Sequence, residues 1–313
     1  MNERPPAGTG RTLVEVAAST SVRFQWDYGH AQDGVRGLFD KAKHAMWDPA
    51  RDIDWSTDVE FGSARPGALG DGLLSDRMWR ASGESFREDL RWHTQAWMLS
   101  QFLHGEQGAL IAAARLVEAV PEVDWKLCAA AQAFDEAKHV EVFERYLREK
   151  LGTTYPVNRE LESLLLSIVA DSRWDVIYLG MQVLVEGVAL GSFAAARMLL
   201  FEPLSRQILD FVLKDEARHV AFGVVALEAV YPTLTSAERA ERLDFVYEAL
   251  ALLNRRFALD DVRERLGLTD AEFAVTAPFA EAFRRKSMAK LGPLLRRLSL
   301  WDDTVASLIS ARA

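Results

Sequence analysis

The chain has 313 residues, of which 49% are hydrophobic and 27% charged, as in ordinary soluble globular proteins. Its net charge of −9 argues against nucleic acid as a partner, and its one cysteine, Cys128, excludes an internal disulfide and an iron–sulfur cluster held by cysteines. We find no apolar run of the roughly eighteen residues that span a bilayer and no apolar leader at the N-terminus, so we expect a cytoplasmic protein without a membrane partner.

The first 83 residues show few helical signals. Residues 1–10 are rich in proline and glycine, which predicts a disordered N-terminus. Residues 11–83 form a lead-in, in which tryptophans stand among turn-forming residues. So many aromatic side chains indicate that the lead-in packs on the bundle that follows instead of serving as a linker. The tryptophans are Trp26, Trp47, Trp55 and Trp79.

Helical periodicity takes over after the lead-in. In the core, residues 84–232, the spacing of apolar residues predicts four long helices and one short extra helix. The long helices are expected at residues 84–120, 123–150, 172–200 and 203–231, and the short one at residues 158–170. Residues 233–313 predict three or four accessory helices of the same domain, broken near Gly267, Pro278 and Gly292. No segment alternates with period two, so we expect an all-α fold with almost no sheet.

A six-residue motif, Asp-Glu-Ala-(Lys/Arg)-His-Val, occurs on the second and again on the fourth predicted long helix. The first copy contains Glu136 and His139, and the second contains Glu216 and His219. Because residues three apart project from one face of an α-helix, each copy can present a carboxylate and an imidazole to one metal ion. A single Glu-x-x-His is more often a solvated pair, so the duplication is what favours a metal site.

The repeat extends to the first and third long helices. Glu106 stands thirty residues before Glu136, and Glu186 stands thirty residues before Glu216. Glu106 lies within a stripe of apolar residues, and buried carboxylates without partners are so costly that such glutamates require cations. Antiparallel packing of the four helices would bring four carboxylates and two imidazoles together, which is the ligand set of a two-metal centre in a helix bundle.

An aspartate precedes the glutamate of each motif, at Asp135 and Asp215. A histidine that binds a metal usually donates its other N–H to a carboxylate, and this bond fixes its tautomer. We therefore predict that each aspartate accepts a hydrogen bond from the histidine of the opposite motif. The other four of the six histidines lack partner spacing, which favours surface or core roles.

The residues one or two turns from each predicted ligand share its helix face. They are mostly apolar, with two glutamines, and such a lining would exclude water and accept an apolar substrate. For any one of them, a plain place in the bundle core is the better interpretation. The pocket candidates are Phe102, Leu110, Gln132, Phe143, Gln182, Leu190, Phe193 and Val212.

At these motifs the chain resembles the ferritin-like di-iron carboxylate superfamily. This group includes ribonucleotide reductase small subunits, multicomponent monooxygenase hydroxylases, acyl-carrier-protein desaturases and R2-like ligand-binding oxidases. The resemblance covers about residues 85–230 and implies a ferritin-like four-helix bundle with flanking helices, two iron ions or a Mn/Fe pair, O2 as co-substrate and a homodimer.

The resemblance leads to a hypothesis about the reaction. We expect an O2-activating oxidase or monooxygenase that forms a peroxo-di-iron intermediate and oxidises a small, largely apolar organic substrate. The chain has no dinucleotide-binding fingerprint and no cysteine cluster, so the electrons would come from an external donor or from the substrate. The alternatives are a non-catalytic metal-binding protein and a radical or cofactor subunit that serves a partner protein, whereas iron storage is disfavoured.

Three marker residues of known branches are missing. Phe143 stands where ribonucleotide reductase small subunits usually carry a radical tyrosine, and Leu190 stands where methane-type hydroxylases keep a threonine. Val212 stands where arylamine N-oxygenases add a third histidine. The sequence therefore leaves the branch and the substrate open.

Overall fold

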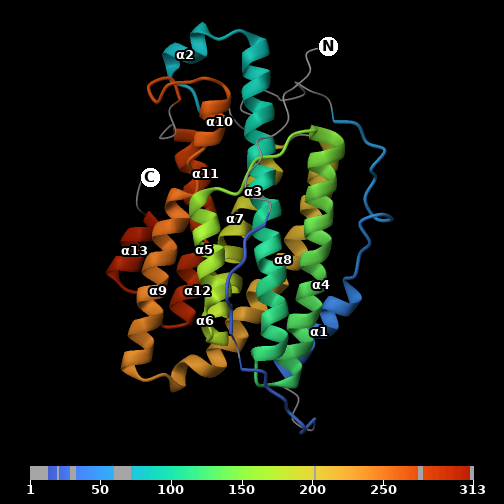
Figure 1. The fold of residues 1–313 in the computed structure, drawn as a ribbon, viewed down its shortest axis with the longest axis vertical. Coiled ribbons are helices and arrows are strands. Elements are labelled where there is room, and N and C mark those ends of the chain that lie inside the picture. The colour runs from blue at the N-terminus through green and yellow to red at the C-terminus, as the bar shows by residue number, and fades with distance from the viewer. Residues whose placement is uncertain are drawn as a thin grey trace.

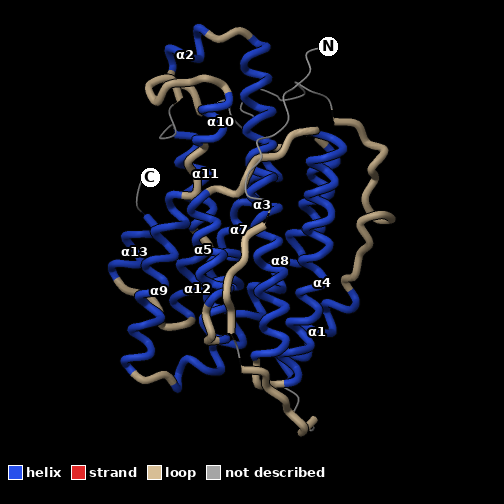
Figure 2. The backbone as a smooth tube through the Cα atoms, viewed as in Figure 1, coloured by secondary structure: helices blue, strands red, loops and turns tan. Residues whose placement is uncertain are grey.

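The protein is built from helices (Figure 2). The structure, a computed structural model, describes residues 13–19, 21–28, 33–59, 72–200, 202–273 and 278–310. Within these ranges there is no strand, and an isolated bridge joins Leu74 to Phe273. The all-α prediction is confirmed, and the predicted disorder of residues 1–10 concerns residues outside the described ranges.

Four long rods form the bundle (Figure 1). In chain order they are α3 (Glu84–Ala119), then α4 (Val123–Tyr146) with its extension η1 (Leu147–Leu151), then α6 (Trp174–Tyr178), η2 (Leu179–Val185) and α7 (Glu186–Leu199) as one rod, and finally α8 (Pro203–Val230). The short extra helix is α5 (Arg159–Ala170). The rods α3 and α8 run in one direction, and α4 and the α6–α7 rod run in the opposite direction (Figure 1).

The helix ends follow the sequence signals. The rod α3 ends just before Pro121, and Gly152, with φ of 59°, adopts the left-handed conformation that ends η1. Pro203 occupies the first turn of α8, where the carboxylate of Glu202 accepts the backbone N–H of Ser205 at 2.8 Å. The predicted boundaries of the four rods are confirmed to within a few residues.

The third rod contains a feature that the apolar periodicity did not predict. Residues Leu179–Val185 form a π-helical stretch directly before Glu186. At Gly180 an added Cβ would lie 2.6 Å from the side chain of Ile168 in α5, so the close approach of α5 and η2 requires glycine there. A π-helical turn changes which side chains face inward, and such turns often occur at functional sites.

The same rod corrects the expectation that no segment could span a membrane. By length and composition, Trp174–Leu199 is apolar enough to do so. However, 89% of its most apolar window is buried inside the protein, and the rod carries Glu186 at its centre. Its apolarity is that of a helix in the middle of a bundle.

The accessory helices number five in the described residues, where three or four were predicted. They are α9 (Ser236–Arg255), α10 (Asp260–Arg265), α11 (Pro278–Met288), α12 (Leu291–Arg297) and α13 (Asp303–Ser310). Two of them have only six and seven residues, too few for a clear periodic signal. The break predicted near Gly292 lies just before it, between the end of α11 at Met288 and the start of α12 at Leu291. The helices α11 and α12 pack on the α6–α7 rod.

The lead-in contributes two helices, α1 (Asp33–His44) and α2 (Asp76–Ala81). The first lies against α4 and α8 near one end of the bundle (Figure 1). Of the lead-in tryptophans, Trp47 is buried against the bundle with 5% of its surface exposed, whereas Trp26 is 76% exposed. Trp47 therefore contacts the interior, together with the buried lead-in residues Val35 and Ile53.

The buried apolar side chains fall into two clusters, one toward each end of the bundle. On α3, Leu99 belongs to one cluster and Ala112 to the other. On α4, which runs the opposite way, Phe143 joins the cluster of Leu99, and Ala129 joins that of Ala112. A layer of buried polar side chains lies between the two clusters.

Candidate metal centre

Six side chains from the four rods meet in this polar layer. They form two groups in which the potential ligand atoms lie within 4.8 Å of one another. The first group is Glu106, Glu136, His139 and Glu216, and the second is Glu136, Glu186 and His219. All six side chains are buried. Glu136 belongs to both groups and is therefore placed to bridge two ions.

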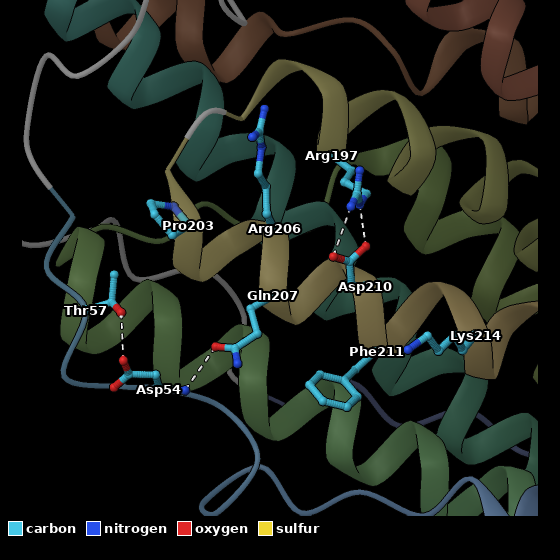
Figure 3. A pocket seen from close by; sticks show the side chains of 9 residues that line it. All are labelled: Asp54, Thr57, Arg197, Pro203, Arg206, Gln207, Asp210, Phe211 and Lys214. Carbon is cyan, nitrogen blue, oxygen red and sulfur yellow. Dashed lines mark hydrogen bonds and ion pairs between the residues drawn. The ribbon is translucent and has the colours of Figure 1, made fainter.

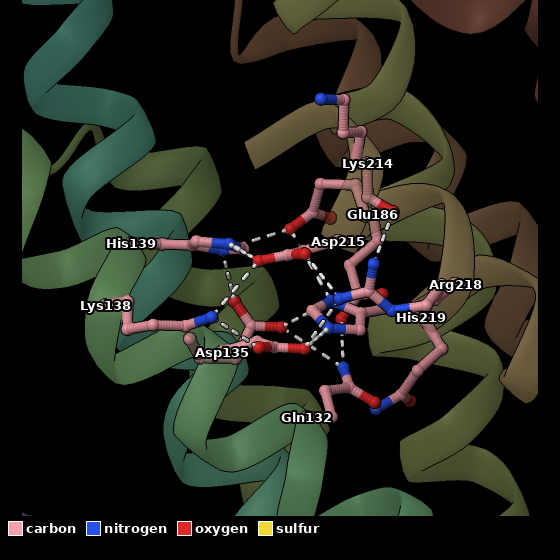
Figure 4. Close-up of polar contacts among 12 residues, drawn as sticks. Gln132, Asp135, Lys138, His139, Glu186, Lys214, Asp215, Arg218 and His219 are labelled. Atoms are coloured by element: carbon pink, nitrogen blue, oxygen red, sulfur yellow. Dashed lines mark hydrogen bonds and ion pairs between the residues drawn. The ribbon is translucent and has the colours of Figure 1, made fainter. Parts of the chain in front are cut away.

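Both imidazoles point one nitrogen toward the carboxylates. His139 Nδ1 lies 3.1 Å from Glu136 Oε2, and His219 Nδ1 lies 3.0 Å from Glu136 Oε1. Their other nitrogens face aspartates of the opposite motif (Figure 4): His139 Nε2 is 3.2 Å from Asp215 Oδ2, and His219 Nε2 is 3.3 Å from Asp135 Oδ2. With Nε2–H donated to an aspartate, Nδ1 keeps a lone pair for a metal ion.

Two cations hold the aspartates in place. Lys138 Nζ lies 2.7 Å from Asp135 Oδ1 and 3.5 Å from Asp215 Oδ2, and Arg218 pairs with both aspartates from the other motif. Burial alone would raise the pKa of Asp215, but the hydrogen bond from His139 and the nearby positive charges lower it well below its usual range. The sequence analysis missed Lys138 and Arg218, although both motif copies carry a basic residue at this position.

Trp47 is a further residue that the sequence analysis did not connect to the site. Its indole N–H donates to Asp215 Oδ2 at 2.7 Å, and its ring stacks on Phe211 at a centroid distance of 5.0 Å. The ammonium of Lys138 lies 4.7 Å from the centre of the same ring. Since 168 residues separate Trp47 from Asp215, no local pattern could have revealed this contact.

The layer has the electrostatics of a metal site. Burial, and then the charge of Glu216, raise the pKa of both Glu106 and Glu186 well above the usual range. Burial also opposes the charge on Glu136, but His219 and His139 outweigh it and lower the pKa of this group. Metal ions bound at these residues would replace protons as the neutralising charge.

The donor set fits two metal ions. Glu186 Oε2 is buried with no hydrogen-bond partner in the described part of the chain. Glu216 Oε1 and His219 Nδ1 are buried with only ion-pair contacts to other predicted ligands, such as the 3.0 Å from His219 Nδ1 to Glu136 Oε1. Such atoms are costly to bury unless something binds them, and all three are types that ligate iron or manganese. The other described histidines have partners elsewhere, as where His104 Nε2 bonds to the backbone oxygen of Tyr155. His30 lies outside the described residues.

The pocket candidates separate into three sets. Phe102, Phe143 and Phe193 lie together in one apolar cluster with ring centroids 4.5–6.0 Å apart, and Val212 is buried in the same cluster. Gln132 and Gln182 are buried in the polar layer and bond to each other. The remaining two, Leu110 and Leu190, are only half-buried and belong to neither cluster.

The positions of Leu110 and Leu190 correct the helix-face count. A residue four positions after a ligand is rotated roughly 40° from it on an α-helix, and one four positions before is rotated by the same angle the other way. In this bundle Phe102 and Val212, four positions before a ligand, are buried, whereas Leu110 and Leu190, four positions after one, are only half-buried. The difference is particular to these rods, because Val220, four positions after Glu216, is buried. Leu110 and Leu190 are therefore poor candidates for a substrate lining.

The pockets near the layer include a wide one at the surface and a narrow crevice. A pocket of about 680 Å³ opens at the surface beside α8 (Figure 3), and its wall residue Phe211 separates it from Trp47. A crevice of about 20 Å³ beneath α1 reaches Gln132 and His219. This crevice has room for about one water molecule.

Comparison with known proteins gives two results. The family model described as p-aminobenzoate N-oxygenase AurF matches residues 30–298. Among solved structures, an R2-like ligand-binding oxidase with an aerobically reconstituted Mn/Fe cofactor has 18% identity and a TM-score of 0.57, over 88% of this chain and 95% of that chain. A variant of such an oxidase, reconstituted anaerobically with Mn/Fe, has 17% identity and a TM-score of 0.58, over 88% and 96%. No curated protein matches the chain.

Proposed function

Because the chain belongs to the AurF family of di-iron N-oxygenases, we propose that it is a monooxygenase that transfers oxygen from O2 to the nitrogen of a small, largely apolar amine. The observation that carries the proposal is the buried layer of four carboxylates and two imidazoles, closed at one end by aromatic side chains. The layer supplies the metal chemistry, and the aromatic end supplies a dry surface for the substrate.

The two groups of the layer would hold the two ions. Glu106 and His139 would serve one ion, Glu186 and His219 the other, and Glu136 both, with Glu216 completing the set. Two iron ions bound there would supply the electrons and the Lewis acidity that O2 activation needs. The four carboxylates balance the charge of two divalent ions, which makes the buried layer neutral when loaded. By ligand type both positions also accept manganese, so a Mn/Fe pair fits the layer as well.

The side chains around the layer prepare it for this chemistry. Asp215 and Asp135 hold the two imidazoles in the tautomer that leaves Nδ1 free for a metal. At the aromatic end, Phe102, Phe143 and Phe193 offer only hydrocarbon surface, so this end excludes water and favours an apolar substrate.

Val212 sets this chain apart from the arylamine N-oxygenases. Where those enzymes add a third histidine, the isopropyl group of Val212 is fully buried in the aromatic cluster. We propose that this chain uses six protein ligands, and that Val212 adds apolar surface beside the substrate. A chain with that surface would prefer a less polar amine than one with an imidazole at this position.

The reaction requires an outside source of electrons. Conversion of R–NH2 and O2 to R–NHOH and water consumes two electrons and two protons. The chain's single cysteine cannot hold an iron–sulfur cluster, so we propose a separate electron donor. We also propose that the protein acts in the cytoplasm as a homodimer.

The test is oxygen transfer by loaded protein. Anaerobic protein is loaded with Fe(II), O2 is admitted, and absorbance is followed with 4-aminobenzoate, aniline or toluene present. We expect a transient absorption band that decays faster with an amine, and a product that carries one atom from ¹⁸O2 by mass spectrometry. Slow oxidation to inert ferric protein, with no transient and no labelled product, would contradict the proposal.

The radical-subunit alternative predicts a different outcome of the same experiment. Tyr146 is a buried tyrosine near the aromatic end, but its hydroxyl donates to Glu202 at 2.7 Å and accepts from Gln95 at 2.9 Å. Burial, and then the charge of Glu202, raise its pKa well above the usual range. A stable tyrosyl radical signal by electron paramagnetic resonance after O2 exposure would favour the alternative.

A further inference from the structure

The two halves of the repeat provide the same ligands, but they differ at the positions one helical turn before the glutamates. Gln132 and Gln182 each stand four residues before a glutamate of the layer, on α4 and in η2. The repeat places Val212 and Phe102 at the equivalent positions of α8 and α3. Because α4 and the α6–α7 rod run in the same direction, both glutamines lie at one end of the layer, and both apolar residues lie at the other (Figure 1).

Gln132 bonds to two of the predicted ligands (Figure 4). Its amide nitrogen donates to Glu186 Oε1 at 2.7 Å and to Glu136 Oε1 at 3.2 Å, which uses both of its N–H groups. Oε1 of Glu186 is thus engaged by an amide, whereas Oε2 is buried without a hydrogen-bond partner in the described chain. Oε2 is the oxygen that remains for a metal ion.

Gln182 fixes the orientation of the Gln132 amide. The carboxylates can only accept, so the NH2 group of Gln132 must face them and its oxygen must face away. That oxygen accepts from Gln182 Nε2 at 3.4 Å. An added Cβ at Gly223 would lie 2.5 Å from the Cβ of Gln182, so the glycine allows this side chain its place.

Glu106 occupies the equivalent position in the other half and has no such support. Among the described residues its hydrogen-bond partner is the ring of His139, at 3.2 Å, and this ring is itself a predicted ligand. One turn before Glu106 stands Phe102, which has no polar group. Nothing in the described chain therefore prevents the carboxylate of Glu106 from changing the oxygen that it presents.

We propose that the glutamine pair makes the two metal positions inequivalent: Gln132, oriented by Gln182, restrains Glu186 to bind through Oε2, whereas Glu106 is free to change its mode of binding. The proposal rests on the proposed function for the presence of two ions. It adds a direction to the site, because Glu106 follows Phe102 of the apolar end by one turn of α3. O2 and the substrate would then react beside Glu106, and the Glu186 side would act as the fixed support.

The experiment is a metal titration of the full-length, metal-stripped protein with Mn(II) under argon. Calorimetry gives the affinity of each binding step, and electron paramagnetic resonance counts the free Mn(II). In Gln132→Met, which keeps the length of the side chain but removes both N–H groups, we expect one of two steps to weaken by about tenfold or more. The other step should weaken by a much smaller factor, because Gln132 also donates, at 3.2 Å, to the shared Glu136. Gln182→Met should weaken the same step by a smaller factor.

A matched control and a double-mutant cycle make the result specific. Gln101 is a buried glutamine of α3 whose amide bonds to the backbone of Pro156 and Asn158, so Gln101→Met should leave both steps unchanged. In a Glu186→Gln background, Gln132→Met should add only the small loss that comes through Glu136, whereas in a Glu106→Gln background it should add its full loss.

The outcomes separate this inference from the proposed function. Weakening of both steps by the same factor in Gln132→Met, or of neither, would overturn the inference while two ions still bind. A full loss in the Glu186→Gln background would also overturn it. If native protein binds no Mn(II), the proposed function itself fails. Melting curves for every variant show that the fold is kept.

Discussion

The two ends of the carboxylate layer differ in what surrounds the ligands. At one end Gln182 donates to Gln132, which donates to two of the glutamates. At the other end Phe102 and Phe193 pack edge to face without a polar atom. The ligands and the aspartates behind them follow the repeat in both halves. The two halves of the repeat are alike where they provide ligands, as the binding of two ions requires. The two ends of the layer differ because oxidation of a substrate requires one end that fixes the ligands and one end that excludes water.

The largest expected effect comes from Glu136, the residue that both ligand groups share. Glu136→Ala removes the carboxylate common to both ligand groups, so the variant should bind fewer than two iron ions per chain and lose oxygenase activity. Elemental analysis of iron per chain is the measurement. Glu141→Ala, at an exposed position of the same helix, should still bind two. Two tightly bound ions in Glu136→Ala would mean that the ligand assignment is wrong.

Replacement of the aspartates that accept from the imidazoles tests whether the two halves of the repeat lose metal affinity alike. Asp215→Asn and Asp135→Asn should each lower metal affinity by about 10–100-fold, because each replaces the charged acceptor that orients a histidine with a neutral amide. We expect the larger loss at Asp215, which also accepts from Trp47. Metal titration compares the two, and Asp210→Asn, an exposed residue paired with Arg197, is the control. Equal affinities in Asp215→Asn and native protein would exclude the orienting role.

The aromatic end should respond in stability and in substrate size. Phe193→Ala opens a cavity in a packed cluster and should lower the free energy of unfolding by about 3–5 kcal/mol, as measured by denaturant titration. The same variant should accept bulkier amines. Phe134→Ala, where the ring is 52% exposed, should change stability by less than about 0.5 kcal/mol. Unchanged stability and substrate range in Phe193→Ala would show that this end is not a packed wall.

The smallest effect concerns the single thiol, which lies at the glutamine end beneath α1. Burial raises the pKa of Cys128 to about 12, and its thiol donates to the backbone oxygen of Val35 at 3.3 Å. Since only the thiolate reacts, alkylation of the native protein should be very slow near neutral pH and rise about tenfold per pH unit toward the raised pKa. The unfolded chain should instead level off near the ordinary thiol pKa. Rapid native alkylation at neutral pH would contradict a closed glutamine end.

Much of this site could be predicted from local patterns. The repeat gave Glu136, His139, Glu216 and His219, because the three-residue spacing determines which side chains share a helix face. The four rods followed from apolar periodicity and from proline and glycine at their ends.

The features that were missed depend on contacts between distant residues. The π-helical stretch before Glu186 is associated with the close approach of Gly180 to Ile168, and the Trp47–Asp215 bond joins the lead-in to α8. The partial exposure of Leu110 and Leu190 depends on the rotation of each rod about its own axis. The spacing of residues along a helix does not determine this rotation.

The most direct test of the account is a crystal structure of the protein loaded with Fe(II) under argon, with anomalous scattering recorded at the iron edge. The account predicts two iron peaks within the layer, with Glu136 between them and with Glu186 bound through the oxygen that Gln132 does not hold. A single peak, or iron peaks away from these carboxylates, would contradict it.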